Sequence, residues 1–570
     1  MAFAELVGVA SMAPFMALVG DITILQRDNL LAALYQQSGL TSEYDFVLLV
    51  GIGVLFLLIV AALISMYTTW KLSVFGVKVG TEISDRLYIH YMTRPWLFHA
   101  NSSSAQLTKQ IANETGRVTN QVIRPLMNMN GRLGLALFFV IAIVLYNPLV
   151  ALVTVAFVGS TYSVLFLFFK RRLKENGRAI SSIATERYRL MNDGFGGIKD
   201  VLLLGKQASF VESFKESSLL FTKSISSNLV IGQIPRYFME LIAFGSIIVL
   251  ILYLIYSHDG NLGIILPILS IYALAGFKLL PAFQQIYGNV TQIRAGIAAF
   301  ESIKEDLIAS KNYVFQPEVY GQESHLVMEK NIKLHNVTFI YPTKIEPALK
   351  NVNIVIPVNK VVGLVGPSGS GKSTIIDIVL NLVEPNNGEL LVDGKVICKD
   401  NRRSWQNNIG FVSQSIFLSE GSIAENIAFG LQIEKINKKQ VEKALRLAHL
   451  FEFVTELPDG IHTKIGERGV QLSGGQRQRI GIARALYHNA SVLVFDEATS
   501  ALDGITEKMI MDAIHDFSGQ KTIIIIAHRL KTVEKCDNIF FIDKGQVVDE
   551  GTFNELLTRN QHFNKLAEHA

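Results

Sequence analysis

Long runs of apolar residues fill the first half of the chain and are missing from the second half. A helix needs about 18 or more apolar residues to cross a bilayer. Ala2–Val19 is such a run although it contains Glu5, and no basic segment precedes it, which argues against a cleaved signal peptide. The pattern predicts an all-helical membrane domain of about six spans, the other five being Phe46–Met66, Leu133–Tyr146, Pro148–Phe169, Leu241–Tyr256 and Gly263–Leu280.

The basic residues between these runs predict how the chain is oriented. Lys and Arg are frequent in Lys71–Arg132 and in Lys170–Arg236, whereas the connection over 22–45 holds only Arg27 and Ser257–Asn261 holds none. Cytosolic segments carry the excess of positive charge in membrane proteins. The two long basic segments are therefore expected in the cytosol, together with both termini and the whole second half.

Each long basic segment is too long to be a simple loop in a compact bundle. Both have helical patterning and few loop-forming residues, so we expect the membrane helices to continue well beyond the bilayer. The turning points are expected near Ser102–Leu107 and Gly194–Val201, where the membrane domain would contact the soluble domain.

Composition adds little to this division. The net charge is +4 and charged residues make up 18% of the chain; this mild basic excess fits cytosolic segments beside anionic lipid and requires no nucleic acid. The two cysteines, Cys398 and Cys536, lie far apart in the soluble half. They form neither a disulfide framework nor a metal site, and we interpret them as packing residues in a reducing compartment.

The soluble half contains a predicted phosphate-binding loop. The short β-branched run Val361–Val365 is followed at once by the loop sequence GPSGSGKST. Its glycines let backbone N–H groups turn toward phosphates at the start of a helix. Lys372 is expected to reach the β- and γ-phosphates of ATP, and Ser373 to bind Mg²⁺. The predicted nucleotide-binding residues of this loop are Gly366, Ser368, Gly369, Ser370, Gly371, Lys372, Ser373 and Thr374.

A second apolar run ends in two carboxylates. Ser491–Phe495 reads as a buried strand, and Asp496 and Glu497 follow it. Asp496 suits Mg²⁺ coordination, and Glu497 suits positioning or deprotonating the attacking water. Acidic residues also mark the ends of many strands without any catalytic role, but the phosphate-binding loop upstream favours the catalytic interpretation.

The segment Leu472–Gln476 reads LSGGQ and resembles the signature of the ABC ATPase family. The resemblance implies that Ser473, Gly474, Gly475 and Gln476 bind nucleotide. It also implies that Tyr341 stacks on adenine, that Gln414 contributes to catalysis and to the Mg²⁺ site with Ser373 and Asp496, and that His528 contacts the γ-phosphate beside the catalytic Glu497. Residues 500–503 match the D-loop of the same family.

In that family the signature binds ATP held by the phosphate-binding loop of another ATPase domain. The resemblance therefore implies a homodimer with two composite ATP sites. The segment Gly466–Gly469 and the order of the two halves resemble exporters. Together these features imply a bacterial inner-membrane exporter with a membrane domain over 1–310, a linker over 311–330 and an α/β P-loop ATPase domain over 331–570.

The membrane half contains four characteristic patches, Phe3–Ala10, Met12–Phe15, Gln233–Glu240 and Phe277–Ala282. These patches resemble PglK-type lipid-linked oligosaccharide flippases. The resemblance implies a polyprenyl-pyrophosphate glycan as substrate, an external amphipathic helix over Asn29–Gln37 beside the lipid tail, and Arg236 and Lys278 as head-group ligands. The chain departs from that family in two respects. Its second span lacks basic residues, and its start at Met1 predicts a truncated first helix.

Other functions share parts of this pattern. The spans exclude a soluble ABC protein of DNA repair or translation, and the intact Glu497 and His528 argue against an ATP-gated channel. An exporter of a lipid A-like lipid, a drug or a peptide would carry every ATPase motif and is the alternative. Arg236 could equally pair with Glu240, four residues on, or reach the membrane edge as an exposed cation.

Overall fold

The computed structural model of the chain describes residues 2–20, 22–26, 30–146, 148–257, 262–312, 325–466, 469–497, 517–527 and 529–568, together with 504, 507–509, 511 and 514. Its contacts divide the chain into two compact units. The first comprises Met1–Arg94 and Asn101–Val314, and the second comprises Pro95–Ala100 and Phe315–Ala570. The predicted linker over 311–330 includes residues 313–324, which lie outside the described part of the chain.

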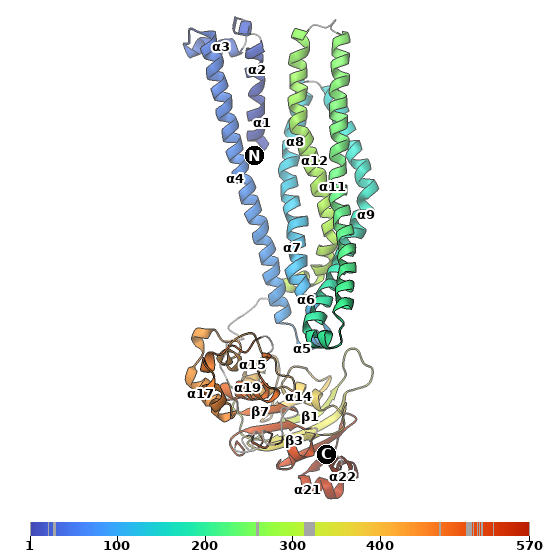
Figure 1. Ribbon diagram of the computed structural model, residues 1–570, viewed down its shortest axis with the longest axis vertical. Helices are drawn as coiled ribbons and strands as arrows, with labels where there is room; N and C mark the ends of the chain where they lie inside the picture. The colour runs from blue at the N-terminus through green and yellow to red at the C-terminus, as the bar shows by residue number, and fades with distance from the viewer. Residues whose placement is uncertain are drawn as a thin grey trace. The chain divides into compact units, whose positions relative to one another are not determined.

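Very long helices build the first unit (Figure 1). Helices α4, α9, α11 and α12 are 50, 49, 51 and 48 residues long. A bilayer core takes only about 20 residues of helix, so the prediction that the membrane helices extend far beyond it is confirmed. By length and hydropathy α4 qualifies as a membrane span within the described residues. The helices with their bounds are α4 Glu43–Met92, α8 Arg124–Tyr146, α9 Pro148–Gly196, α10 Ile198–Leu203, α11 Gln207–Ser257 and α12 Leu262–Ala309.

The first predicted span is not one helix. It consists of α1 (Ala2–Ala10) and α2 (Met12–Gly20), which are separated at Ser11. Pro14 explains the break, because its ring clashes with the carbonyl four residues earlier, at Ala10. Glu5 inside this span is partnered, since the Ser65 hydroxyl on α4 donates to its carboxylate at 3.0 Å.

The segment predicted to be external forms the short helix α3 (Leu30–Ser38). Its Leu31 and Tyr35 pack on a small apolar cluster made of Leu18, Leu25 and Phe46. One face of α3 is therefore covered by the protein itself.

The first cytosolic turn begins after Met92, earlier than the predicted Ser102–Leu107, most of which lies in helix α6 (Ser104–Lys109). Helix α4 ends at Met92, two residues before the Arg94–Pro95 step that disfavours helix, and α5 (Trp96–Asn101) follows. Residues Pro95–Ala100 group with the second unit, and Leu97 packs against one of its apolar clusters. The second turn surrounds α10, a few residues later than predicted.

The helix that follows α5 is irregular. Between α6 (Ser104–Lys109) and α8, two π-helical turns, Gln110–Glu114 and Thr119–Ile123, flank the single α-helical turn α7 (Thr115–Val118). Such wide turns insert an extra residue into a helix and occur frequently at functional sites. The sequence alone predicts a regular helix here.

A six-stranded sheet forms the centre of the second unit, in the order β10-β9-β3-β8-β7-β6. All neighbours are parallel except β9 and β10. An antiparallel sheet in the order β2-β1-β4-β5 accompanies it. The strands are β1 Asn331–Phe339, β2 Leu349–Pro357, β3 Val361–Val365, β4 Asn387–Val392, β5 Lys395–Val396, β6 Ile409–Val412, β7 Val492–Asp496, β8 Thr522–Ile526, β9 Asn538–Asp543 and β10 Gln546–Gly551.

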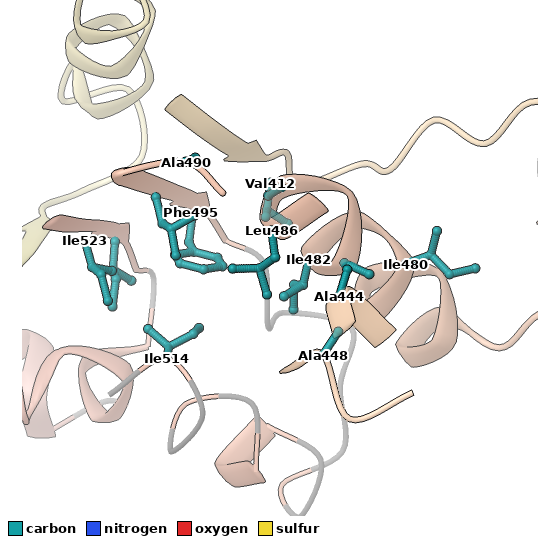
Figure 2. Packing of buried hydrophobic residues seen from close by; sticks show 14 of the residues in the cluster. Val412, Ala444, Ala448, Ile480, Ile482, Leu486, Ala490, Phe495, Ile514 and Ile523 are labelled. Atoms are coloured by element: carbon teal, nitrogen blue, oxygen red, sulfur yellow. The ribbon is translucent and has the colours of Figure 1, made fainter. Parts of the chain in front are cut away.

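Apolar side chains cover both faces of the six-stranded sheet. Leu493 and Phe495 of β7 point into one cluster, and Val492 and Val494 of the same strand point into the other. In Figure 2, Phe495 lies against Leu486 of a covering helix. Described helices of this unit are α14 Lys372–Val379, α15 Arg402–Gln406, α16 Ile423–Ile427, α17 Lys438–Leu447, α18 Phe451–Glu456, α19 Gly474–Tyr487, α21 Phe553–Arg559 and α22 Gln561–Glu568.

Candidate functional site

The predicted phosphate-binding loop joins β3 to α14. A Cβ on Gly366 would lie 2.0 Å from the carbonyl oxygen of Ile542, so only glycine fits there. Gly371 precedes the helix with φ = 108°, and a Cβ on it would lie 2.7 Å from Leu349. These two positions allow the loop to pack closely against Ile542 and Leu349 at the start of α14, where helix N–H groups favour anions.

Lys372 is buried beneath this loop, with 4% of its surface exposed. Its Nζ donates to the carbonyl oxygens of Gly366 at 2.8 Å and Pro367 at 2.9 Å. Burial lowers the pKa of Lys372, while the charges of Glu497 and Asp496 act in the opposite direction. The ammonium group is thus held in the loop that phosphates would enter.

Tyr341 lies beside the same loop. Its hydroxyl is 3.1 Å from the Thr374 hydroxyl, and its ring meets Phe339 edge to face with centroids 4.9 Å apart. The structure therefore brings the predicted adenine-stacking residue to the predicted phosphate site.

The two predicted carboxylates end β7 at the same edge of the sheet as the loop, because β7, β8 and β3 run parallel. Glu497 adopts φ = 50°, a left-handed conformation that costs a non-glycine residue on the order of 1–3 kcal/mol. Two contacts hold it there. Its N–H donates to Ile526 O at 3.2 Å, and Gln414 Nε2 donates to its carboxylate at 2.7 Å.

Asp377 was missed by the sequence argument. It lies on α14, four residues after Ser373. Burial, and then the charge of Asp496, raise the pKa of Asp377 to about 6. The signal in the sequence was an acidic residue in an otherwise apolar helix run, one turn beyond the phosphate-binding loop.

The signature segment caps helix α19. Ser473 is the N-cap: its hydroxyl accepts from Gln476 N at 3.2 Å, and Gln476 Oε1 accepts from Ser473 N at 2.8 Å. Gly474 and Gly475 form the first turn, where free N–H groups and the helix dipole favour an anion. Among the described residues, the hydrogen bonds of Ser473 and Gln476 stay within this cap.

Several predicted residues cannot be placed. His528 and residues 498–503, which include the D-loop match, lie outside the described part of the chain. So do residues 467 and 468 of the exporter-like segment and the side chain of Lys278 on α12.

Arg236 lies on α11 and lines a cavity of about 440 Å³ in the first unit. Its Nε donates to Glu240 Oε1 at 2.7 Å, which is the local ion pair that the sequence allowed as the alternative. Arg132 of α8 lines the same cavity and was not predicted.

Known proteins match both parts of the chain. Residues 12–278 match the ABC transporter transmembrane region and residues 349–500 match the ABC transporter family model. An ATP-dependent lipid A-core flippase of Photobacterium profundum is 30% identical over 530 residues, covering 92% of this chain and 88% of that protein. The chain belongs to the ABC transporter family. It is an ATPase coupled to transmembrane transport.

Further relatives agree. Lipid A-core flippases of Aliivibrio fischeri and Escherichia coli are each 30% identical, over 98% and 88% of this chain and 94% and 85% of their own lengths. A bacterial Atm1-family ABC exporter with ATP bound has the same fold, with a TM-score of 0.78 at 22% identity over 100% of this chain and 96% of that one. The predicted exporter fold, a helical membrane domain followed by a P-loop ATPase domain, is confirmed. The finer resemblance to PglK-type flippases stays a prediction.

Proposed function

We propose that this transporter uses ATP hydrolysis to flip a phosphorylated glycolipid of the lipid A kind across the bacterial inner membrane. The observation that carries the proposal is the match to lipid A-core flippases over almost the whole of both chains. A polyprenyl-pyrophosphate glycan, our first expectation from the sequence, is the second candidate. The external helix α3 and the patchy resemblance of the membrane helices favour it. Both candidates are lipids that carry a saccharide phosphate.

We propose a role in ATP binding for each side chain near the loop. Lys372 would exchange its two carbonyl partners for phosphate oxygens, and Tyr341 would stack on adenine. The Ser373 hydroxyl, the Gln414 amide oxygen and the Asp496 carboxylate are hard oxygen donors, the kind that suits Mg²⁺. Bound there, Mg²⁺ would neutralise charge on the transferred phosphoryl group.

Glu497 is the proposed group that orients and deprotonates the attacking water. Its backbone is held in a strained conformation by β8, and its carboxylate is aimed by Gln414. A positioned group of this kind needs little reorganisation during the reaction. His528 is proposed as the γ-phosphate contact on the basis of the family resemblance alone.

A complete site requires a second copy of the chain. One chain holds one ATPase domain, and ABC half-transporters work as dimers. We propose a homodimer in which Ser473–Gln476 of one copy meets ATP bound at the loop of the other. The N-terminus of α19, where Ser473 is exposed and its hydroxyl is held by the capping interaction, is suited to receive a phosphate.

Reconstitution in liposomes tests the substrate. The purified chain and its Glu497→Gln variant are incorporated separately, and ATP-dependent movement to the inner leaflet is measured for lipid A and for a polyprenyl-pyrophosphate glycan. The proposal expects the wild type to move lipid A and the variant to move neither lipid. Movement of the polyprenyl lipid alone would favour the second candidate. Movement of neither lipid by an active ATPase would refute the proposed function.

A further inference from the structure

The segment that follows Gln414 is seated on helix α19. A Cβ on Gly481 of this helix would lie 2.5 Å from Cδ1 of Ile416, so a glycine is needed for Ile416 to pack this closely. Two residues further, Leu418 is 2% exposed, and a Cβ on Gly469, in the turn before the signature, would lie 2.5 Å from it. The chain just after Gln414 therefore packs on α19 and on the turn that leads into it.

The side chain of Asn426 closes the far end of this segment. Asn426 is fully buried. Its Oδ1 accepts from Ser419 N at 2.9 Å, and its Nδ2 donates to the carbonyl oxygens of Ser419 and Ser422, at 3.1 Å each. A buried amide whose donors and acceptor are all used favours one backbone arrangement. Residues 419–426 are thus tied into a compact loop.

Arg484 of α19 holds this loop. Its Nε donates to Asn426 O at 2.8 Å, and its guanidinium carbon lies 4.7 Å from the centre of the Phe429 ring. Burial lowers the pKa of Arg484, and among the described residues no carboxylate opposes that shift. A buried cation without a carboxylate is costly. Arg484 is therefore better explained by what it positions than by stability alone.

Gln414 lies between two anchors. Before it, β6 pairs with β7, with Val412 opposite Phe495. After it, Ile416 packs on α19. The Gln414 side chain is itself exposed, and its Nε2 donates to the Glu497 carboxylate at 2.7 Å. An exposed side chain depends on its backbone for its direction, so the two anchors decide whether this hydrogen bond forms.

We propose that Gly481 and Arg484 are positioning residues, which hold the segment after Gln414 on α19 and so direct the Gln414 amide at the Glu497 carboxylate of the same chain. The proposal rests on the proposed function, in which Glu497 activates the attacking water. Since α19 also carries the signature at its N-terminus, one helix links the signature of a chain to the catalytic carboxylate of that chain. In the proposed homodimer these two groups serve opposite ATP sites.

A double-mutant cycle separates positioning from stability. ATP hydrolysis by the purified full chain is measured for Arg484→Met, Gln414→Ala and the double variant. Arg484→Met should lower kcat roughly 10-fold, the scale of a lost charged hydrogen bond, with KM for ATP unchanged. Added to Gln414→Ala it should cost nothing further, because the group that it directs is gone. Arg484→Lys should recover only part of the turnover, since Lys lacks the planar guanidinium.

A second arginine on α19 is the matched control. Arg479 donates to the carbonyl oxygen of His449 at 2.8 Å, away from the segment after Gln414. Arg479→Met removes the same side-chain atoms from the same helix and should leave kcat and KM unchanged.

Gly481 allows a test in which turnover and stability change differently. Ala forms helix more readily than Gly, so Gly481→Ala should not lower the melting temperature. Its methyl group should displace Ile416 and so lower kcat. Ile416→Val removes Cδ1, the atom nearest to the new methyl group, so Gly481→Ala/Ile416→Val should recover most of the lost turnover.

Mixed dimers assign the effect to one copy of the chain. When one copy carries Lys372→Ala, the working site uses the loop and Glu497 of the intact copy and the signature of the other. Arg484→Met in the copy that supplies Glu497 should lower kcat, whereas Arg484→Met in the Lys372→Ala copy should not. Equal losses from either copy would show that Arg484 only supports the signature and would overturn the proposal.

Two other results would also overturn it. One is an additive loss in the Gln414→Ala/Arg484→Met variant, and the other is a raised KM at unchanged kcat in Arg484→Met. If the Lys372→Ala mixed dimer is inactive before Arg484 is changed, the proposed shared site fails, and the double-mutant cycle in the uniform protein decides the role of Arg484.

Discussion

Replacing Glu114 tests how much buried ion pairs stabilise the first unit. Glu114 is fully buried in the irregular helix, at one of the two π-helical turns. Arg117 Nη1 lies 2.9 Å from its carboxylate and Lys109 Nζ lies 3.5 Å from it. The two cations in turn reach α9, where Arg117 donates to Ser181 at 2.6 Å and Lys109 to Thr185 at 2.9 Å. We predict that Glu114→Gln strongly destabilises this unit.

The magnitude follows from the burial of all three groups. Removing one partner of a buried ion pair leaves an uncompensated charge and costs about 3–5 kcal/mol. Here the lost carboxylate leaves two buried cations without their partner: Lys109, which is 6% exposed, and Arg117, which is 9% exposed. Replacing all three groups by apolar residues removes the charge problem and is often neutral. We therefore expect Lys109→Met/Glu114→Leu/Arg117→Met to be more stable than Glu114→Gln alone.

Thermal unfolding of the purified full chain measures the effect. Glu114→Gln should lower the first unit's melting temperature by roughly 6–20 °C, since about 3–5 kcal/mol is lost and each 1 kcal/mol corresponds to roughly 2–4 °C in a large domain. The control is Glu175→Gln on α9, which breaks an ion pair with Arg171, whose side chain is 88% exposed. No measurable shift is expected there. A melting temperature of Glu114→Gln within error of the wild type, or a triple variant less stable than the single one, would refute the reasoning.

Two further predictions concern the ATPase unit. Lys372→Ala and Ser473→Arg should each abolish ATP hydrolysis. Dimers that contain one copy of each variant should regain part of it, because one of their two composite sites pairs an intact loop with an intact signature. A mixture as inactive as each variant alone would contradict the shared site. Asp377→Asn should stabilise the unit by about 1 kcal/mol at pH 8 after allowance for partial exposure, because the raised pKa of about 6 makes the ionised carboxylate unfavourable in the folded state above that pH. The gain should fade as the pH falls from about 6 toward the ordinary value of 3.8 and be nearly absent at about pH 3, where Asp377 is mostly protonated in both states, and denaturation at pH 8 and at about pH 3 checks this sign.

Local patterns predicted much of the fold. The strand, glycine loop and helix around Lys372 are encoded within a few consecutive residues, and so is the cap formed by Ser473 and Gln476. The long helices also follow from apolar runs and basic flanks. These features depend on neighbours in the chain, which is why sequence reasoning reached them.

Contacts between distant segments account for what was missed. The π-helical turns lie where Thr119 meets Gly80, at which a Cβ would come within 2.0 Å of the threonine hydroxyl. Nothing near Thr119 in the sequence reveals that neighbour. The bond from Gln414 to Glu497 joins residues 83 positions apart. Arg132 lies 104 positions before Arg236 in the chain, and only helix packing brings both to the same cavity.

Glu497 is proposed to drive ATP turnover in a site shared by two copies of the chain. ATP hydrolysis and retention of labelled ATP by purified wild type and Glu497→Gln test it most directly. Turnover in the variant is expected to fall by about 10²–10⁴ while two ATP molecules stay trapped per dimer. Turnover within a few-fold of the wild type, or a variant that retains no ATP, would contradict it.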